Sequence, residues 1–325
     1  MSRTKLSDLI NDFLEYCEIE KGHSRLTIAN YDHYLQRFLK FAGDIPARKI
    51  TQELIRKYRI HLNRLQDEHG RGLSRATQNY HIIALRTLIK YLEKRDIKVG
   101  VSVEKIELTP QEERQINFLE GEELQRFLNA PDVRTISGLR DKAILEVLFS
   151  TGLRVSELCK LQKEDVNLKT GEFGVKGKGD HVRVVFLSDN AKNWLKRYLG
   201  TRNDNYPALF IRHMKKEKLA KAPDEYEAAE EAARSHLTPR TIQRIVKKYA
   251  TAAGITKKIT PHALRHTFAT DLLSSGADLR SVQEMLGHSS VTTTQVYTHL
   301  TNPQLRKVHE KFHGKKREIE ENKNS

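Results

Sequence analysis

The chain has 325 residues, and its 57 lysine and arginine side chains outnumber its 42 acidic ones, which gives a formal net charge of +15. Its mean hydropathy is −0.62, and its purely apolar runs are only a few residues long, as at 82–85 and 184–187. A membrane-spanning helix needs about 20 consecutive apolar residues. These features exclude a membrane protein and leave room for two globular domains.

Two further features indicate the cell compartment. Residues 1–13 are amphipathic and lack a continuous apolar segment, so we expect no signal peptide. The two cysteines, Cys17 and Cys159, are too few for a disulfide framework. We therefore expect a protein of the reducing cytoplasm.

The positive charge favours a polyanionic partner, because lysine and arginine side chains that neutralise phosphates release counterions. Both residues 1–108 and residues 109–325 carry more basic than acidic side chains. A soluble protein that is merely basic explains the charge alone equally well. Since the excess is spread along the chain, a partner that contacts both parts fits better than a partner of one basic tail.

The first hundred residues are predicted to form four helices. Apolar residues recur at helical spacing over 5–18. Ser24, Thr51 and Ser74 are suitable N-caps for three further helices, and Gly43 is a suitable end for the second. The polar face of the fourth helix carries a basic stripe: Arg75, Asn79, Arg86 and Lys90. This stripe suits a DNA groove, and a solvated helix face explains it equally well.

Residues 99–116 lack an amphipathic period and contain Pro110, so we expect a linker there. Beyond it, the pattern predicts helices at 119–128 and 139–149, strands at 166–168, 172–175 and 182–187, and a return to helices after 190. Residues 214–236 are highly charged and poor in large apolar side chains, so we expect a solvated helical excursion.

The segment 259–300 holds the densest group of chemically versatile side chains. Thr260 and Pro261 are a favourable helix opening, an N-cap followed by proline at the first helical position. His262 and Arg265 then lie three residues apart on one face, near the positive end of that helix. This arrangement suits an anion.

A second helix in this segment is predicted from Asp278 to Leu286, with Gly287 at its end. His288 follows directly, and Tyr297 lies nine residues further on. Each of these side chains alone would favour ordinary packing over a functional role.

The histidines also allow a metal site, because His262 and His266 have the i, i+4 spacing of zinc ligands. Arg265 between them, Arg280 nearby and the lack of an evident third ligand all argue against it. The sequence also has no GxxxxGK[ST] loop for nucleotide phosphates. We expect neither a metal nor another cofactor.

Taken together, His262, Arg265, His288 and Tyr297 resemble the C-terminal signature of the tyrosine recombinases, the phage integrase family. The segment TGLRVSEL at 151–158 resembles the first arginine box of that family, with Arg154 as the arginine, and Lys178 matches its catalytic lysine. Lengths and motifs are most similar to the Xer type, although the segment 214–236 is longer than is usual there.

The resemblance implies a mostly α fold with a small β-sheet, made of an N-terminal four-helix DNA-binding domain and a mixed α/β catalytic domain. We expect the helical domain at 1–98, the linker at 99–116, the catalytic domain at 117–313 and a disordered tail at 314–325. A helix at 303–312 would dock on a neighbouring protomer or pack on its own domain. The implied partners are double-stranded DNA with a specific recombination site and three further protomers, identical or including a second recombinase.

The resemblance also implies the reaction, a transesterification of a DNA phosphodiester without ATP or metal. Tyr297 would be the nucleophile, and Arg154 and Arg265 would bind the non-bridging phosphate oxygens. Lys178 would be the general acid for the leaving 5′ oxygen, His262 the general base and His288 a hydrogen-bond donor. Glu157 is expected to orient Arg154 or its helix.

Three functions of different classes remain open from the sequence. The first is an active site-specific recombinase, either a Xer-type enzyme of chromosome-dimer resolution or an integrase or excisionase of a mobile element. The second is an inactive family member that only binds DNA. The third is a metal-dependent nuclease built on the histidines. The complete set of six residues favours the first.

Overall fold

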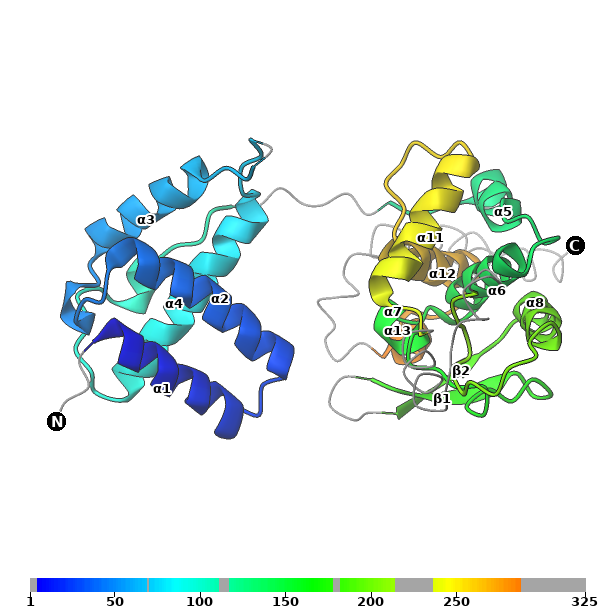
Figure 1. The fold of residues 1–325 in the computed structure, drawn as a ribbon, viewed down its shortest axis with the longest axis horizontal. Coiled ribbons are helices and arrows are strands. Elements are labelled where there is room, and N and C mark those ends of the chain that lie inside the picture. Colours follow the sequence, from blue (N-terminus) through cyan, green and yellow to red (C-terminus); the bar gives the residue numbers. More distant parts are fainter. Residues whose placement is uncertain (1–4, 69, 111–116, 178–181, 214–235, 288–325) are drawn as a thin grey trace, which may run out of the picture. The chain divides into compact units, whose positions relative to one another are not determined.

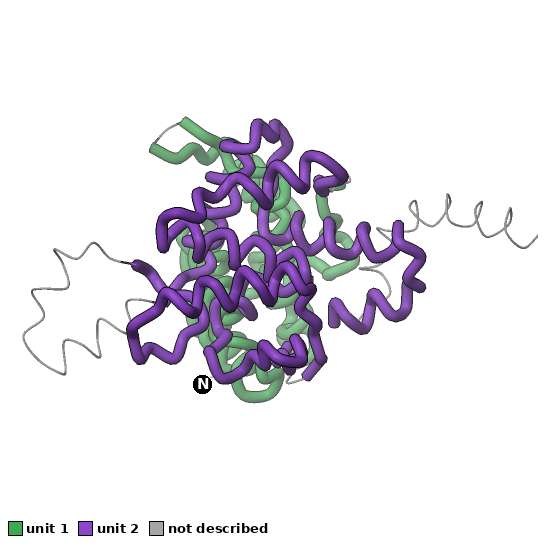
Figure 2. The backbone as a smooth tube through the Cα atoms, turned by 90° about the vertical axis from the view of Figure 1, so that its right-hand side faces the viewer, with its two compact units in different colours: residues 1–114 green, residues 115–325 purple. Residues whose placement is uncertain are grey.

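The computed structural model describes residues 5–68, 70–110, 117–177, 182–213 and 236–287. The chain divides into two compact units, residues 1–114 and residues 115–325, which Figure 2 colours separately. We describe each unit by itself. Among the described residues, no helix is both long and apolar enough to cross a membrane.

The regular elements of unit 1 are helices throughout its described part (Figure 1). Its elements are α1 (Leu6–Ile19), α2 (Arg25–Ala42), the 3-10 helix η1 (Ala47–Lys49), α3 (Gln52–Arg64), α4 (Arg75–Lys94) and the 3-10 helix η2 (Val103–Lys105). The side-chain oxygens of Ser24, Thr51 and Ser74 accept hydrogen bonds from backbone N–H groups three residues later, at 3.1–3.3 Å. The four predicted helices and the three predicted N-caps are therefore confirmed.

The helices of unit 1 share one apolar core. Phe13, Leu35, Tyr58 and Leu88 are fully buried in it. Each buried side chain of this size contributes about 1.5–3 kcal/mol to folding.

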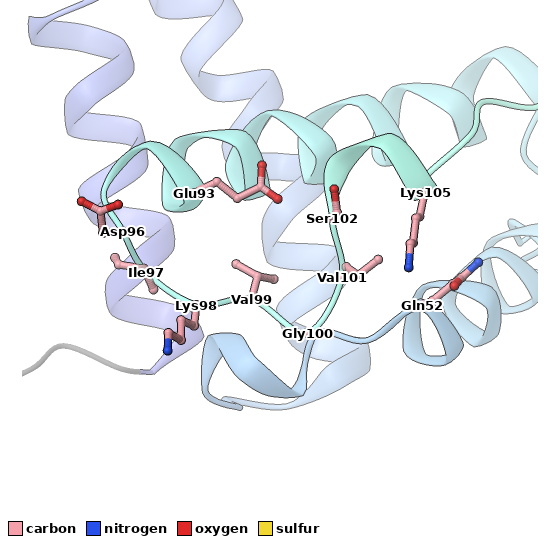
Figure 3. A pocket seen from close by; sticks show the side chains of 10 residues that line it. All are labelled: Gln52, Glu93, Asp96, Ile97, Lys98, Val99, Gly100, Val101, Ser102 and Lys105. Atoms are coloured by element: carbon pink, nitrogen blue, oxygen red, sulfur yellow. The ribbon is translucent and has the colours of Figure 1, made fainter.

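The segment expected as a linker is partly incorporated in unit 1. Val101 and Ile106 are buried in its core. A Cβ added at Gly100 would lie 2.4 Å from the carbonyl oxygen of Arg48, so only glycine allows this close approach. The same stretch, together with Glu93 and Gln52, lines an open pocket at the end of α4 (Figure 3). The first half of the segment thus belongs to the helical unit, because its apolar side chains find places in the core.

Two residues of the predicted basic stripe hold this segment. Asn79 is buried, and its side-chain amide donates to the carbonyl of Thr109 at 2.8 Å and accepts from the Thr109 N–H at 3.2 Å. Arg86 donates to the carbonyl of Ile106 at 2.6 Å. Asn79 is therefore buried, and its amide is used inside the unit. Arg75 and Lys90 are exposed.

We expect Asn79→Ala to lower the free energy of unfolding of unit 1 by about 1–3 kcal/mol, because two hydrogen bonds to the Thr109 backbone would be lost and each contributes about 0.5–1.5 kcal/mol. Lys90→Ala, an exposed change on the same helix, is the control and should stay within about 0.5 kcal/mol of wild type. Denaturant unfolding of the two variants measures both values. Equal stability of Asn79→Ala and wild type would contradict this role.

Unit 2 combines helices with a two-stranded sheet (Figure 1). Its described elements are α5 (Gly121–Asn129), α6 (Ile136–Thr151), α7 (Val155–Leu158), β1 (Glu172–Lys176), β2 (Val182–Phe186), α8 (Asp189–Gly200), α11 (Pro239–Ala252), α12 (Pro261–Ser274) and α13 (Leu279–Leu286). The strands pair antiparallel, with Gly174 opposite Val184. Helix α6 is buried on nearly all sides and contacts α5, α8, α12 and β2.

One predicted strand is wrong. Residues 166–168 form no strand, and the chain turns there instead. The side-chain oxygen of Asn167 accepts hydrogen bonds from the N–H groups of Lys169 and Thr170, at 2.9 and 3.3 Å. Such local bonds compete with strand pairing. The strands predicted at 172–175 and 182–187 are confirmed.

The predicted excursion at 214–236 lies, except for His236, outside the described residues, but the chain on either side of it is held together. Ile211 and His236 form an antiparallel bridge, and Arg140 donates to the carbonyl of Ile211 at 3.0 Å.

We expect replacement of 214–235 by a short Gly-Ser linker to preserve cooperative unfolding and to stabilise the unit by about 1 kcal/mol, because closing a shorter loop costs less entropy. Calorimetry would test this, and a loss of the cooperative transition would contradict it.

Candidate active site

Arg154 is presented by a tight turn after helix α6. The helix ends at Gly152, whose positive φ of 59° is a left-handed conformation that favours glycine. A Cβ at Gly152 would also lie 2.5 Å from a ring carbon of Phe268 on α12. The turn therefore packs directly on α12, and this packing fixes the backbone position of Arg154.

Glu157 holds Arg154 in two ways. One carboxylate oxygen accepts a hydrogen bond from the Arg154 N–H at 2.8 Å, and the other accepts from the Arg154 guanidinium at 2.9 Å. The side chain of Arg154 keeps 39% of its surface exposed, whereas that of Glu157 keeps 6%. Glu157 thus orients both the helix start and the arginine, as the sequence predicted, and Arg154 remains accessible to a substrate.

Helix α12 supplies the other two predicted groups that the structure describes. The Thr260 hydroxyl caps it by accepting from the Ala263 N–H at 3.2 Å, which confirms the predicted opening. Arg265 is buried and donates to the carbonyls of Gly152 and Leu286. Arg265 therefore ties α12 both to the turn before Arg154 and to the end of α13.

His262 lies at the surface one turn before His266, and the Nε2 atoms of the two rings are 2.9 Å apart. Partial burial of the ring, together with the positive charges of Arg265 and then Arg154, lowers the pKa of His262 below its usual 6.5. The imidazole is therefore neutral near pH 7, which suits a proton acceptor. Among the described residues, no three His, Cys, Asp or Glu side chains cluster as metal ligands would.

The lowered pKa of His262 gives a pH prediction. Because the neutral imidazole is the accepting form, we expect the cleavage rate to fall with decreasing pH around a midpoint below 6.5. In an NMR titration, the His262 ring should titrate at that midpoint, and Arg154→Gln should raise it by removing one positive charge. A midpoint at or above 6.5 in the wild type would contradict the assignment.

The end of α13 joins these groups. Helix C-termini leave carbonyls without partners inside the helix and carry a partial negative charge. The carbonyl of Met285 accepts from Arg183 at 3.0 Å, that of Leu286 from Arg265, and that of Gly287 from Arg154 at 3.2 Å. Three successive carbonyls thus bind three arginines from three different elements.

The sequence did not indicate Arg183, which lies on β2 and whose side chain is 9% exposed. It donates to both carboxylate oxygens of Glu157, at 3.0 and 2.7 Å. Burial alone would raise the pKa of Glu157, but hydrogen bonds from Arg183 and Arg154 hold it at about 2. One feature of the sequence could have pointed to Arg183. In the alternation of strand β2 it shares the inward-facing side with Val185, where an apolar side chain would be usual.

The structure therefore brings Arg154, His262 and Arg265, three of the six expected site residues, together. The exposed guanidinium of Arg154 can bind a phosphate, and the neutral imidazole of His262 can accept a proton beside it. Arg265 is 3% exposed and adds a second positive charge while it holds the turn and the end of α13 together. Lys178, His288 and Tyr297 lie outside the described residues.

Family comparisons agree with this geometry. Residues 117–303 match the phage integrase family, and residues 10–96 match the N-terminal SAM-like domain of phage integrases. The chain belongs to the tyrosine recombinases of the phage integrase family. It is therefore an enzyme of DNA strand exchange.

The similarity to named relatives extends over nearly the whole chain. The recombinase is 36% identical to tyrosine recombinase XerC of Thermodesulfovibrio yellowstonii, over 96% of this chain and 98% of that one. It is 35% identical to tyrosine recombinase XerD of Staphylococcus epidermidis, over 95% of this chain and 99% of that one.

Two solved structures have the same fold. XerH site-specific recombinase bound to its palindromic difH substrate matches with a TM-score of 0.67 and 24% identity, over 92% of this chain and 83% of that one. The Tn1549 transposon integrase in complex with a circular intermediate DNA matches with a TM-score of 0.70 and 18% identity, over 95% of this chain and the whole of that one. At these identities the two matches support the fold, a mostly helical protein with a small sheet.

Proposed function

We propose that this recombinase is a Xer-type site-specific enzyme that cleaves and rejoins DNA through a 3′-phosphotyrosyl intermediate and resolves chromosome dimers in the cytoplasm. The observation that carries the proposal is the similarity to XerC and XerD, which extends over nearly the full length of both chains. The grouping of Arg154, His262 and Arg265 around the end of α13 supports the chemistry.

In the proposed cleavage step, the Tyr297 oxygen attacks the scissile phosphorus and the bond to the 5′ oxygen breaks. His262 accepts the phenolic proton, and Lys178 donates a proton to the leaving oxygen. Arg154 and Arg265 stabilise the charge that develops on the non-bridging oxygens, and His288 donates a further hydrogen bond. One phosphodiester replaces another of similar energy, so rejoining by the reverse steps needs no ATP.

The arginines suit this step because guanidinium groups bind phosphate oxygens in a planar, bidentate manner that lysine does not reproduce. The exposed part of Arg154 is available for such contact. Glu157 and the carbonyls at the end of α13 hold the arginines before the substrate arrives. Preorganised charge of this kind is usually the largest contribution to catalysis.

The partners in this proposal are double-stranded DNA with a specific site and a tetramer of recombinase protomers, either four copies of this chain or two pairs with a second recombinase. The helix expected at 303–312, which would dock between protomers, lies outside the described residues.

A second candidate function is integration or excision of a mobile element, which uses the same chemistry. The length of the charged segment 214–236 favours it, because it departs from the Xer pattern.

Covalent trapping on sheared DNA of the source genome tests the proposal. Adducts that resist SDS are captured without added metal or ATP, and the attached DNA is sequenced. One site near the replication terminus is expected for chromosome-dimer resolution, and sites at element ends would instead establish an integrase. Retained DNA binding without any adduct would overturn the proposed chemistry in favour of a binding-only protein.

A further inference from the structure

Arg183 lies on strand β2, and its side chain reaches the end of α13, where Arg154 and Arg265 also bind. Its guanidinium contacts Glu157 through two hydrogen bonds and the carbonyl of Met285 through a third, so that all three of its nitrogens are used. The side chain lies along the end of α13, since a Cβ at Gly287 would be 3.0 Å from its Cδ atom. Arg183 therefore bonds both to Glu157, which holds Arg154, and to the end of α13, close to Gly287.

The carboxylate of Glu157 is shared between two arginines. Each oxygen accepts one bond from Arg183 and one from Arg154, whose backbone N–H and guanidinium use different oxygens. Because Arg183 occupies both oxygens from its side, Arg154 directs only one guanidinium nitrogen to Glu157. The other terminal nitrogen of Arg154 reaches the carbonyl of Gly287 instead.

Without Arg183, this sharing would end. A buried carboxylate that loses one charged partner is left with an uncompensated charge, and this charge attracts the remaining cation strongly in the low-dielectric interior. The fork of Arg154 would then be drawn into a bidentate pair with Glu157 and away from Gly287, so that fewer of its N–H groups would point to a substrate phosphate.

We propose that Arg183 is a positioning residue for strand cleavage, which holds Arg154 in its phosphate-binding orientation by clamping Glu157 against the end of α13. The inference rests on the proposed cleavage chemistry and extends it to a side chain that does not touch the substrate. It also makes strand β2, which directly follows the segment that contains Lys178, part of the support of the arginine pair.

The test compares Arg183 with a second buried arginine in the same unit. Arg140 has a side chain that is 10% exposed, forms an ion pair with Asp141 and donates to the carbonyl of Ile211, so it matches Arg183 in burial and bonding but lies outside the site. The variants are Arg183→Gln, Arg183→Lys, Arg140→Gln and Arg140→Lys. The substrate is a nicked duplex that carries the site recovered by trapping, from which the short released strand diffuses away.

Three quantities are measured well below the unfolding temperature: the dissociation constant for the duplex, the single-turnover adduct rate at saturating protein and the melting temperature. We expect Arg183→Gln to lower the saturating rate at least tenfold while the dissociation constant changes less than threefold. Arg183→Lys should recover part of the rate, because it keeps the charge. The Arg140 variants should lower the melting temperature without lowering the rate.

A double-mutant cycle distinguishes positioning from a general structural effect. If Arg183 acts through Arg154, Arg183→Gln should slow an Arg154→Lys enzyme less than threefold further. Additive losses, an unchanged rate in Arg183→Gln or equal rate losses in the Arg140 variants would each overturn the inference. If Arg183→Gln does not fold, Arg183→Lys replaces it in the comparison and in the cycle, and an unchanged rate in Arg183→Lys would overturn the inference. Absence of adduct with the wild-type protein would instead overturn the proposed function itself.

Discussion

Tyr297→Phe should abolish covalent adduct formation while DNA binding stays at the wild-type level. The substitution removes only the phenolic oxygen, which is the atom that would bond to phosphorus, and other groups can still bind the duplex. Loss of a nucleophile lowers the rate by on the order of 10⁴-fold or more. Denaturing gel electrophoresis of protein incubated with labelled DNA measures the adduct, and a mobility shift measures binding.

The control is Tyr206→Phe, which removes a phenolic oxygen elsewhere in the same unit and should form adducts at the wild-type rate. Adduct formation by Tyr297→Phe would show that another side chain is the nucleophile. Loss of DNA binding in Tyr297→Phe would show that the tyrosine has a structural role in addition to the chemical one.

Arg154→Lys should lower the cleavage rate by about 10²–10³-fold, the usual effect of removing one donor to a developing oxyanion. Lysine keeps the positive charge but has no planar fork, so it cannot bind Glu157, the carbonyl of Gly287 and a phosphate at once. Because the Arg154 side chain is 39% exposed, we expect only a small change in the melting temperature. Single-turnover cleavage assays and calorimetry measure the two effects.

Arg126→Lys is the matched control for Arg154→Lys. Arg126 also forms an ion pair with a glutamate of its own helix, but its side chain is 54% exposed and lies on α5. This variant should cleave at the wild-type rate. A cleavage rate of Arg154→Lys within threefold of wild type would contradict the role of the guanidinium.

Helix boundaries could be predicted where the interactions that set them are local. Ser24, Thr51 and Ser74 each accept a hydrogen bond from a backbone N–H three residues away, so the sequence within one helical turn determines the cap. Asp278 caps α13 in the same way, by accepting from the Ser281 N–H at 2.9 Å, and Gly287 ends that helix as expected.

Roles that depend on distant partners could not be predicted. Asn79 and Arg86 carry the spacing of a polar helix face, but their partners, Thr109 and Ile106, are 30 and 20 residues away. The strand expected at 166–168 failed for the opposite reason, because the short-range bonds of Asn167 outweigh three residues of apolar pattern.

The candidate site was predictable in part. Helical spacing placed His262 and Arg265 on one face, and the resemblance to the tyrosine recombinases pointed to Arg154, which Glu157 was expected to orient. Arg183 remained unnoticed because its interaction with Glu157 spans 26 residues and depends on how β2 packs beside α7 and α13. Which arginine donates to which carbonyl of residues 285–287 likewise depends on the packing of distant elements, so it could not be predicted from the sequence.

The most direct test of the central claim is to locate the covalent bond between protein and DNA. Adduct formed on the trapped site is digested with nuclease and protease, and the nucleotide-bearing peptide is sequenced by tandem mass spectrometry. We predict a single modified peptide in which Tyr297 carries a 3′-linked nucleotide phosphate. Attachment to any other residue, or a 5′-linked nucleotide on Tyr297, would contradict the account.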